Sequence, residues 1–320
     1  MGGRVIRVGI AWVGGAWLLL AWALGAAAAT PTCVDFLKIS MLPRVAALGD
    51  ATVAVRDAAW AEANPANLTS VDGSLITFSH ATWFQDISLE MLAFGTSTGR
   101  HAFGLTLAGL HTEPLARYSS EDEYEGEFRY FDFLVAATYA MAPAAPLRLG
   151  VTGKTIYEKI DWDSATGFAL DLGLGYDLPP RAFRGELSAG FALRNLGTKM
   201  GYFEKKYDLP LTWQGGLAYK PSWLPSSIGA LVAVDYRTAR GSSGAVLVGA
   251  EFEVMKMVAL RVGSRGRAGG SDATAGLGLT IKNMTLDYAY MDPGRNLGAT
   301  HRIALGFRTS RILPSPEASR

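Results

Sequence analysis

The sequence is poor in the residues on which small secreted folds and metal-binding domains depend. It has one cysteine, Cys33, so neither an intrachain disulfide nor a cysteine zinc cluster can form. Charged residues make up 18% of the 320 residues, below the roughly 25% that is usual for soluble domains. The formal net charge is +1, which gives no indication of nucleic-acid binding or of a polybasic membrane-surface arm.

Motifs for catalysis and for cofactors are missing as well. The four histidines are isolated in sequence, and there is no Gly-x-Ser-x-Gly elbow, Walker loop or dinucleotide fingerprint. We therefore predict a protein that is not an enzyme and that uses no metal or cofactor. The acidic stretch from Glu113 to Glu127 lacks the ordered spacing of a calcium loop. A solvated surface loop is favoured there over a site for divalent ions that bridge lipopolysaccharide.

Only one long apolar run is present, and it lies at the start of the chain. Two arginines precede the apolar residues 8–24, and five small residues follow them. This order is typical of a secretory signal peptide, which we expect to be residues 1–29, cleaved after the small residues. An uncleaved membrane anchor is the alternative, because the run is about as long as a short spanning helix.

From residue 74 onward, apolar side chains alternate with small or polar ones in segments separated by turns. Between Phe168 and Tyr176, for example, every second residue is large and apolar, and Ala, Asp or Gly lie between them. A period of two is that of a β-strand with one apolar face. The second face is mostly Gly, Ala, Ser and Thr, which suits a crowded lumen better than bulk solvent. Apolar outside and polar inside is the arrangement of a transmembrane β-barrel.

Fourteen candidate strands can be counted, and an even number is the rule for single-chain bacterial barrels. They are expected at residues 74–84, 87–98, 101–112, 127–140, 147–158, 165–178, 184–196, 210–220, 227–238, 244–254, 257–264, 271–282, 284–291 and 300–309. We therefore predict an all-β fold, a closed antiparallel transmembrane barrel of about 14 strands over residues 73–309, followed by a C-terminal tail, residues 310–320.

The predicted connections sort by length. If the first strand starts in the periplasm, the inner turns are short, whereas most outer loops are longer, as is usual for these barrels. The outer loops include residues 113–126, 160–164, 197–209 and 264–270.

Before the first strand lies a segment with a different pattern. A helical turn is expected over residues 57–63, ended by Pro65. Three stretches of the chain resemble the PorV/PorQ family, which is related to the FadL-type outer-membrane transporters. They are Pro43-Arg44 with Leu48-Gly49-Asp50-Ala51 and Asn64-Pro65-Ala66-Asn67-Leu68; Leu193-Arg194-Asn195-Leu196-Gly197; and Leu297-Gly298-Ala299-Thr300-His301-Arg302-Ile303-Ala304-Leu305. The resemblance spans residues 40–309.

The resemblance implies a leader and plug (hatch) over residues 30–72, inside the barrel. Asn64, Pro65 and Asn67 match the hatch motif, where they would bend the plug backbone and help to close the lumen. It also implies a bacterial outer-membrane protein, exported by its signal peptide, with lipid and lipopolysaccharide as partners. The implied function is a channel or transporter for small hydrophobic molecules. The alternative is a non-enzymatic, type IX-like secretion component that binds exported proteins at the cell surface.

The alternation also places charged side chains in the lumen, with five of each sign. They are Arg148, Lys154, Arg194, Arg261 and Arg302, and Asp171, Asp235, Glu251, Glu253 and Asp287. Charges there need partners or water. A selective pore lining is one interpretation. Ion pairs that hold plug to wall are favoured, because the signs balance.

The two faces predict different responses to substitution. Replacing the outward Leu172 or Val232 with Arg should impair assembly by roughly 2–4 kcal/mol at the midplane. Replacing Gly173, which is expected to face the lumen, with Ser should be far milder.

Overall fold

A computed structural model describes residues 31–56, 60–83, 87–178, 183–202, 205–267, 269–292 and 298–309. The predicted signal peptide, residues 1–29, and the predicted tail, residues 310–320, lie outside these ranges. Within them, no helix has the length and apolar character needed to span a membrane.

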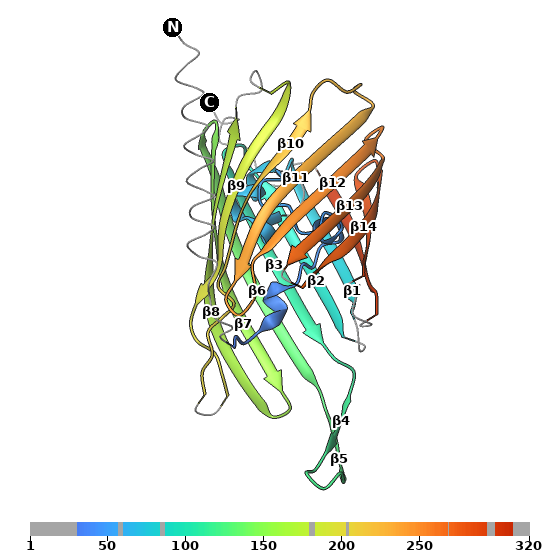
Figure 1. Cartoon of the computed structure of the whole chain (residues 1–320). Helices are drawn as coiled ribbons and strands as arrows, with labels where there is room; N and C mark the ends of the chain where they lie inside the picture. The colour runs from blue at the N-terminus through green and yellow to red at the C-terminus, as the bar shows by residue number, and fades with distance from the viewer. Residues whose placement is uncertain are drawn as a thin grey trace.

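Fourteen antiparallel strands form a closed barrel (Figure 1). They are β1 (Ser74–Thr82), β2 (Ser88–Ser97), β3 (His101–His111), β6 (Tyr130–Ala144), β7 (Leu147–Ile160), β8 (Asp163–Leu178), β9 (Gly185–Gly197), β10 (Thr212–Pro221), β11 (Ile228–Ala239), β12 (Ala245–Val254), β13 (Val258–Arg267), β14 (Gly270–Ile281), β15 (Met284–Asp292) and β16 (Thr300–Thr309). Each strand pairs with its neighbours along the chain, and the ring closes where β1 pairs with β16. The predicted fold class is confirmed.

The faces of the strands follow the predicted alternation. Leu172 and Val232 are 47% and 49% exposed on the outside of the ring, whereas Asp171 and Asp235 are buried within it. A continuous outer surface of large apolar side chains is stable against lipid and unfavourable against water, so the barrel is a transmembrane one.

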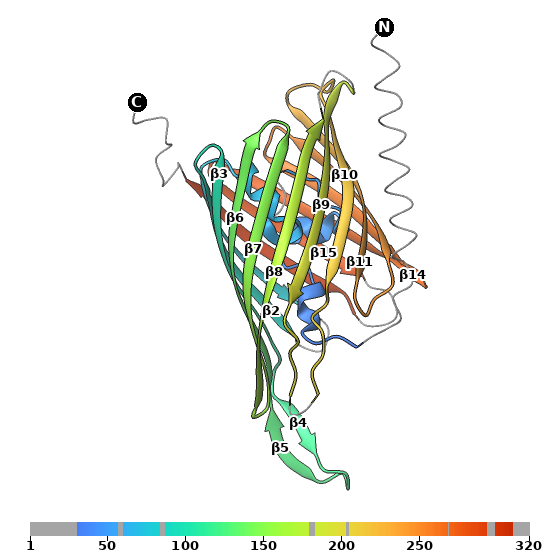
Figure 2. The ribbon, with the colours of Figure 1, turned by 90° about the vertical axis from the view of Figure 1, so that its left-hand side faces the viewer.

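A two-stranded hairpin lies outside the ring. β4 (Leu115–Tyr118) and β5 (Tyr124–Phe128) pair only with each other and project beyond one end of the barrel (Figures 1 and 2). We name this the hairpin end, and the opposite end the short-turn end. The sequence predicted a loop over residues 113–126, and this prediction was wrong. A hairpin beyond the bilayer has no lipid-facing side, so its strands lack the apolar alternation by which the other strands were recognised.

Two other loops predicted at the hairpin end are shorter than expected. β7 ends at Ile160 and β8 begins at Asp163, so residues 160–164 are mostly strand. β13 continues to Arg267, and β14 begins at Gly270. Backbone pairing persists beyond the level where lipid requires an apolar face, so the sequence pattern ends before the strands do.

The described residues before β1, from residue 31 onward, lie inside the ring (Figure 2). Its short helices are η1 (Asp35–Lys38), α2 (Pro43–Ala47), α3 (Trp60–Ala63) and η2 (Pro65–Ser70). α2 contacts β13 to β16, and η2 contacts β2, β3 and β6 to β8. Leu48, Val53 and Leu68 are fully buried there. The expected helical turn over residues 57–63 corresponds to α3, although residues 57–59 lie outside the described residues.

Inward-facing glycines allow this segment to approach the wall closely. A Cβ on Gly249 would lie 2.4 Å from the Leu48 carbonyl oxygen, and a Cβ on Gly263 would lie 2.2 Å from the Gly49 amide. Side chains at these positions would collide with backbone atoms. The glycines therefore let backbone pack on backbone.

Candidate functional site

Asn64 joins the inner segment both to itself and to the wall. Its side chain is fully buried, and its Nδ2 donates to the Val53 and Leu174 carbonyl oxygens, both at 2.9 Å. Its Oδ1 accepts from the Ala66 amide at 3.0 Å, which caps the start of η2. Pro65 follows as the first residue of η2, where its missing amide hydrogen costs nothing.

Asn67 provides the second attachment of this motif. Its Nδ2 donates to the Thr52 carbonyl oxygen at 3.3 Å, within the segment. Its Oδ1 accepts from Arg148 Nη1 at 3.0 Å, and Arg148 also pairs with Asp177 at 3.0 Å. Through Arg148, Asn67 is therefore attached to the carboxylate of Asp177 on β8.

Gly173 faces the lumen, but the prediction that Gly173→Ser would be mild is wrong. A Cβ at Gly173 would lie 2.1 Å from Asn64 Oδ1 and 2.8 Å from the Ala66 amide nitrogen. Gly150 is similar, since its Cβ would lie 2.3 Å from the Pro65 carbonyl carbon. The wall is therefore fitted to the Asn64-Pro65 turn.

A chain of charges links α2 to the wall on the opposite side of the lumen. Arg44 Nη2 lies 2.6 Å from Glu251 Oε1, and Arg261 Nε lies 2.5 Å from Glu251 Oε2. Arg261 Nη1 lies 2.5 Å from Asp287 Oδ1. Each ion has a partner of opposite sign, which is the condition for keeping charges in a buried site.

Three more of the predicted lumen residues bind the inner segment directly. Asp235 Oδ2 accepts from the Val53 amide at 2.9 Å. Arg194 Nη1 donates to the Glu62 carbonyl oxygen at 2.9 Å, and Arg302 Nε donates to the Ser40 carbonyl oxygen at 3.0 Å. These contacts place wall side chains on backbone groups that would otherwise be unsatisfied.

Lys154 and Asp171 pair with each other instead of with the segment. Their closest atoms are 2.6 Å apart, and Lys154 Nζ also donates to Asn195 Oδ1 at 2.9 Å. Asp171 Oδ1 accepts from the Asn195 amide at 2.8 Å. Glu253 shares the inner face of β12 with Glu251 and is half-buried.

One buried cluster, centred on Asp50, was not predicted from the sequence. Asp50 lies 2.9 Å from Arg237 Nη1 and 3.0 Å from Arg265 Nη2, and it accepts a hydrogen bond from Ser40 Oγ at 2.6 Å. Burial alone raises the pKa of this carboxyl, but the two arginines outweigh it and lower the pKa to about 2. The alternation of the predicted strand 227–238 places Arg237 on the same face as Asp235, and extending the predicted strand 257–264 by one residue would have placed Arg265 in the lumen as well.

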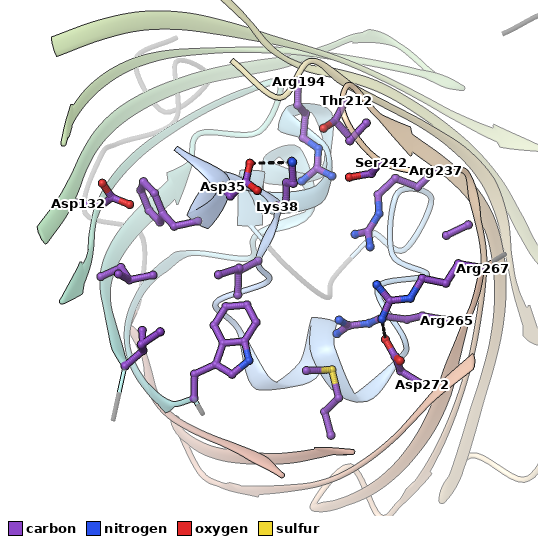
Figure 3. A pocket seen from close by; sticks show the side chains of 18 of the residues that line it. Asp35, Lys38, Asp132, Arg194, Thr212, Arg237, Ser242, Arg265, Arg267 and Asp272 are labelled. Atoms are coloured by element: carbon purple, nitrogen blue, oxygen red, sulfur yellow. Dashed lines mark hydrogen bonds and ion pairs between the residues drawn. The ribbon is translucent and has the colours of Figure 1, made fainter. Parts of the chain in front are cut away.

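A cavity of about 580 Å³ occupies the lumen toward the hairpin end (Figure 3). Its apolar lining is Phe36, Ile39, Trp83, Ile87, Leu110 and Met291. Its cationic lining is Lys38, Arg194, Arg237, Arg265, Arg267 and Arg302, against three carboxylates, Asp35, Asp132 and Asp272. Figure 3 shows the arginines Arg194, Arg237, Arg265 and Arg267 gathered on one side, with Asp132 across the cavity. The cavity is therefore amphipathic. Four of its six cations already pair with carboxylates, Lys38 with Asp35, Arg267 with Asp272, and both Arg237 and Arg265 with Asp50 beneath the lining.

A second cavity, of about 570 Å³, lies toward the short-turn end. Arg56, Thr69, Arg148, Asp177 and Glu186 contribute to its more polar lining. The two cavities have no lining residue in common. Asn64 and Asn67, which line neither cavity, belong to the segment between them.

Comparison with known proteins agrees with the barrel fold. Residues 32–136 match the model of an uncharacterised protein family (UPF0164). No curated protein matches the chain. The toluene transporter TbuX of Ralstonia pickettii is similar at 15% identity and a TM-score of 0.59, over 83% of this chain and 97% of that one.

Two further solved structures are similar to a comparable degree. The monoaromatic hydrocarbon channel CymD has 11% identity and a TM-score of 0.58, over 84% of this chain and 97% of its own. The toluene transporter TodX of Pseudomonas putida has 11% identity and a TM-score of 0.58, over 82% and 95%. At these identities the likeness establishes a shared fold. These neighbours are transporters and channels, not enzymes, whereas membership of the PorV/PorQ family stays a prediction.

Proposed function

We propose that this protein is an outer-membrane channel or transporter for small hydrophobic molecules, and that molecules which also carry an anionic group fit it best. The observation that supports this proposal is the amphipathic cavity inside a closed transmembrane barrel. Its apolar side favours hydrocarbon. Arg194 and Arg302 of its lining bond neutral oxygens, including the carbonyl oxygens of Glu62 and Ser40, and their charge favours a carboxylate or similar group. The hairpin end then faces the outside and the short turns face the periplasm, in keeping with the loop-length rule.

In this proposal, residues 30–72 form the leader and plug (hatch), and Asn64, Pro65 and Asn67 bend its backbone and help to close the lumen. The plug separates the outer cavity from the inner one, so passage requires part of the segment to shift. The plug is attached to the wall through Asn64, Asn67, Asp50 and Arg44. The strength of these contacts then determines how readily the plug shifts. This proposal combines the two interpretations of the lumen charges. Most of the charged side chains hold the plug to the wall, and the arginines at the outer cavity also line the path of a ligand.

The test is uptake of radiolabelled toluene and benzoate into vesicles that contain the purified protein. Ala245 lines the outer cavity, whereas the next residue, Val246, is 49% exposed on the lipid side. Ala245→Trp should fill the cavity and lower uptake of both compounds, with benzoate the better substrate of the unmodified protein. Val246→Trp is the matched control and should leave uptake unchanged. The proposal would be refuted if the two variants showed equal uptake. It would also be refuted if vesicles without protein took up as much of both compounds as vesicles with the unmodified protein.

The secretion alternative is favoured by a different observation, the hairpin β4–β5. Tyr118 and Tyr124 on the hairpin are 59% and 61% exposed, and Trp162 nearby at the same end is 77% exposed. Exposed aromatic side chains of this kind are common anchors at protein interfaces. Replacing residues 115–128 with a short turn should abolish retention of exported proteins at the cell surface if this alternative holds. Under the transport proposal the same deletion should leave uptake intact.

A further inference from the structure

A basic and apolar patch lies at the short-turn end, on the side of the barrel formed by β12 to β16. It consists of Lys256, Lys282 and Arg308 together with Met255, Met257, Ile281 and Met284, and we name it the basic rim patch. All of these residues are exposed, with Met255 at 68% and Ile281 at 53%.

Backbone hydrogen bonds show that the parts of this patch are adjacent. The Thr280 amide donates to the Met257 carbonyl oxygen at 2.7 Å, which joins the turn after β12 to the end of β14. The Arg308 amide donates to the Asn283 carbonyl oxygen at 2.8 Å, which joins the turn after β14 to the end of β16. The patch is therefore one continuous surface built from three neighbouring strand ends.

The cations of the patch have no acidic partner in the described part of the chain. No ion pair or side-chain hydrogen bond joins Lys256, Lys282 or Arg308 to another of the described residues. This differs from the lumen, where Arg44, Arg148, Lys154 and Arg261 each pair with a carboxylate.

The turns of the patch hold large side chains where glycine or asparagine would be easier. Met255, Lys256 and Lys282 have φ angles of 52°, 55° and 56°, in the left-handed region that disfavours residues with a Cβ. A turn chosen only to reverse the chain would carry glycine there. This chain carries long apolar and cationic side chains at these positions in spite of the strain.

We propose that the basic rim patch binds the phosphate headgroups of anionic phospholipids in the periplasmic leaflet. The lipid-facing surface continues into the patch, since Leu260 and Leu286 on β13 and β15 are 55% and 43% exposed. Met255, Ile281 and Met284 then contact the acyl chains near the interface. The flexible stems of Lys256 and Lys282 extend toward the headgroups and carry their charge there. The proposal rests on the outer-membrane orientation given above, but it needs no transport activity.

The experiment measures lipid binding by the full-length purified protein. Native mass spectrometry would count phosphatidylglycerol and phosphatidylcholine molecules retained from mixed micelles at low salt. The unmodified protein should prefer phosphatidylglycerol. The double variant Lys256→Ser/Lys282→Ser should lose about 5-fold of that preference for each lysine, which corresponds to about 1 kcal/mol per cation near an anionic lipid surface.

The matched control is Lys205→Ser/Lys206→Ser, which removes the same charge from exposed positions at the hairpin end. It should keep the preference of the unmodified protein. An unmodified protein without any preference, or an equal loss in both double variants, would overturn the proposal. This outcome is independent of the uptake assay. A barrel that transports nothing can still retain phosphatidylglycerol, and uptake can be measured in phosphatidylcholine vesicles that contain no phosphatidylglycerol.

Discussion

Asn64→Ala is expected to loosen the inner segment without unfolding the barrel. The asparagine side chain makes three hydrogen bonds of 2.9–3.0 Å in a fully buried position. Alanine would leave the Val53 carbonyl and the Ala66 amide without these partners, far from water. At about 1 kcal/mol for each bond, the loss of all three comes to about 3 kcal/mol, or roughly a 100-fold shift toward a segment that is both detached from the wall and locally unfolded.

Hydrogen exchange followed by mass spectrometry would measure this shift. Peptides from residues 40–70 should exchange about 100-fold faster in Asn64→Ala, while peptides from β7 to β16 keep their rates. The folded protein should still migrate differently from boiled protein on a gel. Asn283→Ala, in an exposed turn, serves as the control and should change neither measurement. Unchanged exchange in residues 40–70, or faster exchange everywhere, would refute the idea that Asn64 attaches a separable segment to the wall.

Three more variants probe the same architecture. Leu172→Arg puts a charge on the lipid face and should lower the free energy of unfolding in vesicles by roughly 2–4 kcal/mol. Gly306→Ser, at an inward site whose nearest neighbours are 3.7 Å from the added Cβ, should not. Similar losses in the two variants would contradict the assigned faces. Gly173→Ala should mimic Asn64→Ala in hydrogen exchange, because its Cβ would displace the Asn64 side chain, and a wild-type pattern would show that the wall does not fix the turn. Burial raises the pKa of Glu62 to about 7, so its docked form holds a proton more tightly than a free glutamate does; docking is then strongest at low pH and weakens as the pH rises through 7. Exchange of the segment, corrected for intrinsic rates, should therefore be faster at pH 8.5 than at pH 5.5, and Glu62→Gln should remove this difference; an equally large difference in the variant would assign the effect to another group.

Local alternation was sufficient to predict the wall of this barrel. The side chains of a strand alternate strictly, so the exposed Leu172 and the buried Asp171 could be assigned to opposite faces from their neighbours alone. The even strand count then followed from how a barrel closes. The predicted sorting of the connections was right only in part, since β7–β8 and β13–β14 are joined at the hairpin end by two residues each. Pattern reading failed at the strand ends, such as Arg267, because lipid no longer selects apolar residues there.

The interior could not be predicted in the same way. The partners of Asp50 are 187 and 215 residues further along the chain, at Arg237 and Arg265, and no local pattern records that pairing. Gly173 looked like a spacer because its neighbour, Asn64, comes from another part of the chain. The resemblance to known hatch segments pointed to Asn64, Pro65 and Asn67, but their hydrogen-bond partners became visible only in three dimensions.

The seam between β1 and β16 determines the order in which the protein can be built. The first strand pairs with the last, so the ring cannot close until β16 is available to pair with β1. The inner segment precedes β1 and contacts residues as distant as Arg302, 262 positions away from Ser40. The closed ring therefore depends on contacts between residues that lie far apart in the sequence, both at the seam and between the wall and the inner segment. Contacts between residues so distant in sequence make folding slow. Until the ring closes, the apolar outer face of the incomplete barrel needs a chaperone to keep it from aggregating.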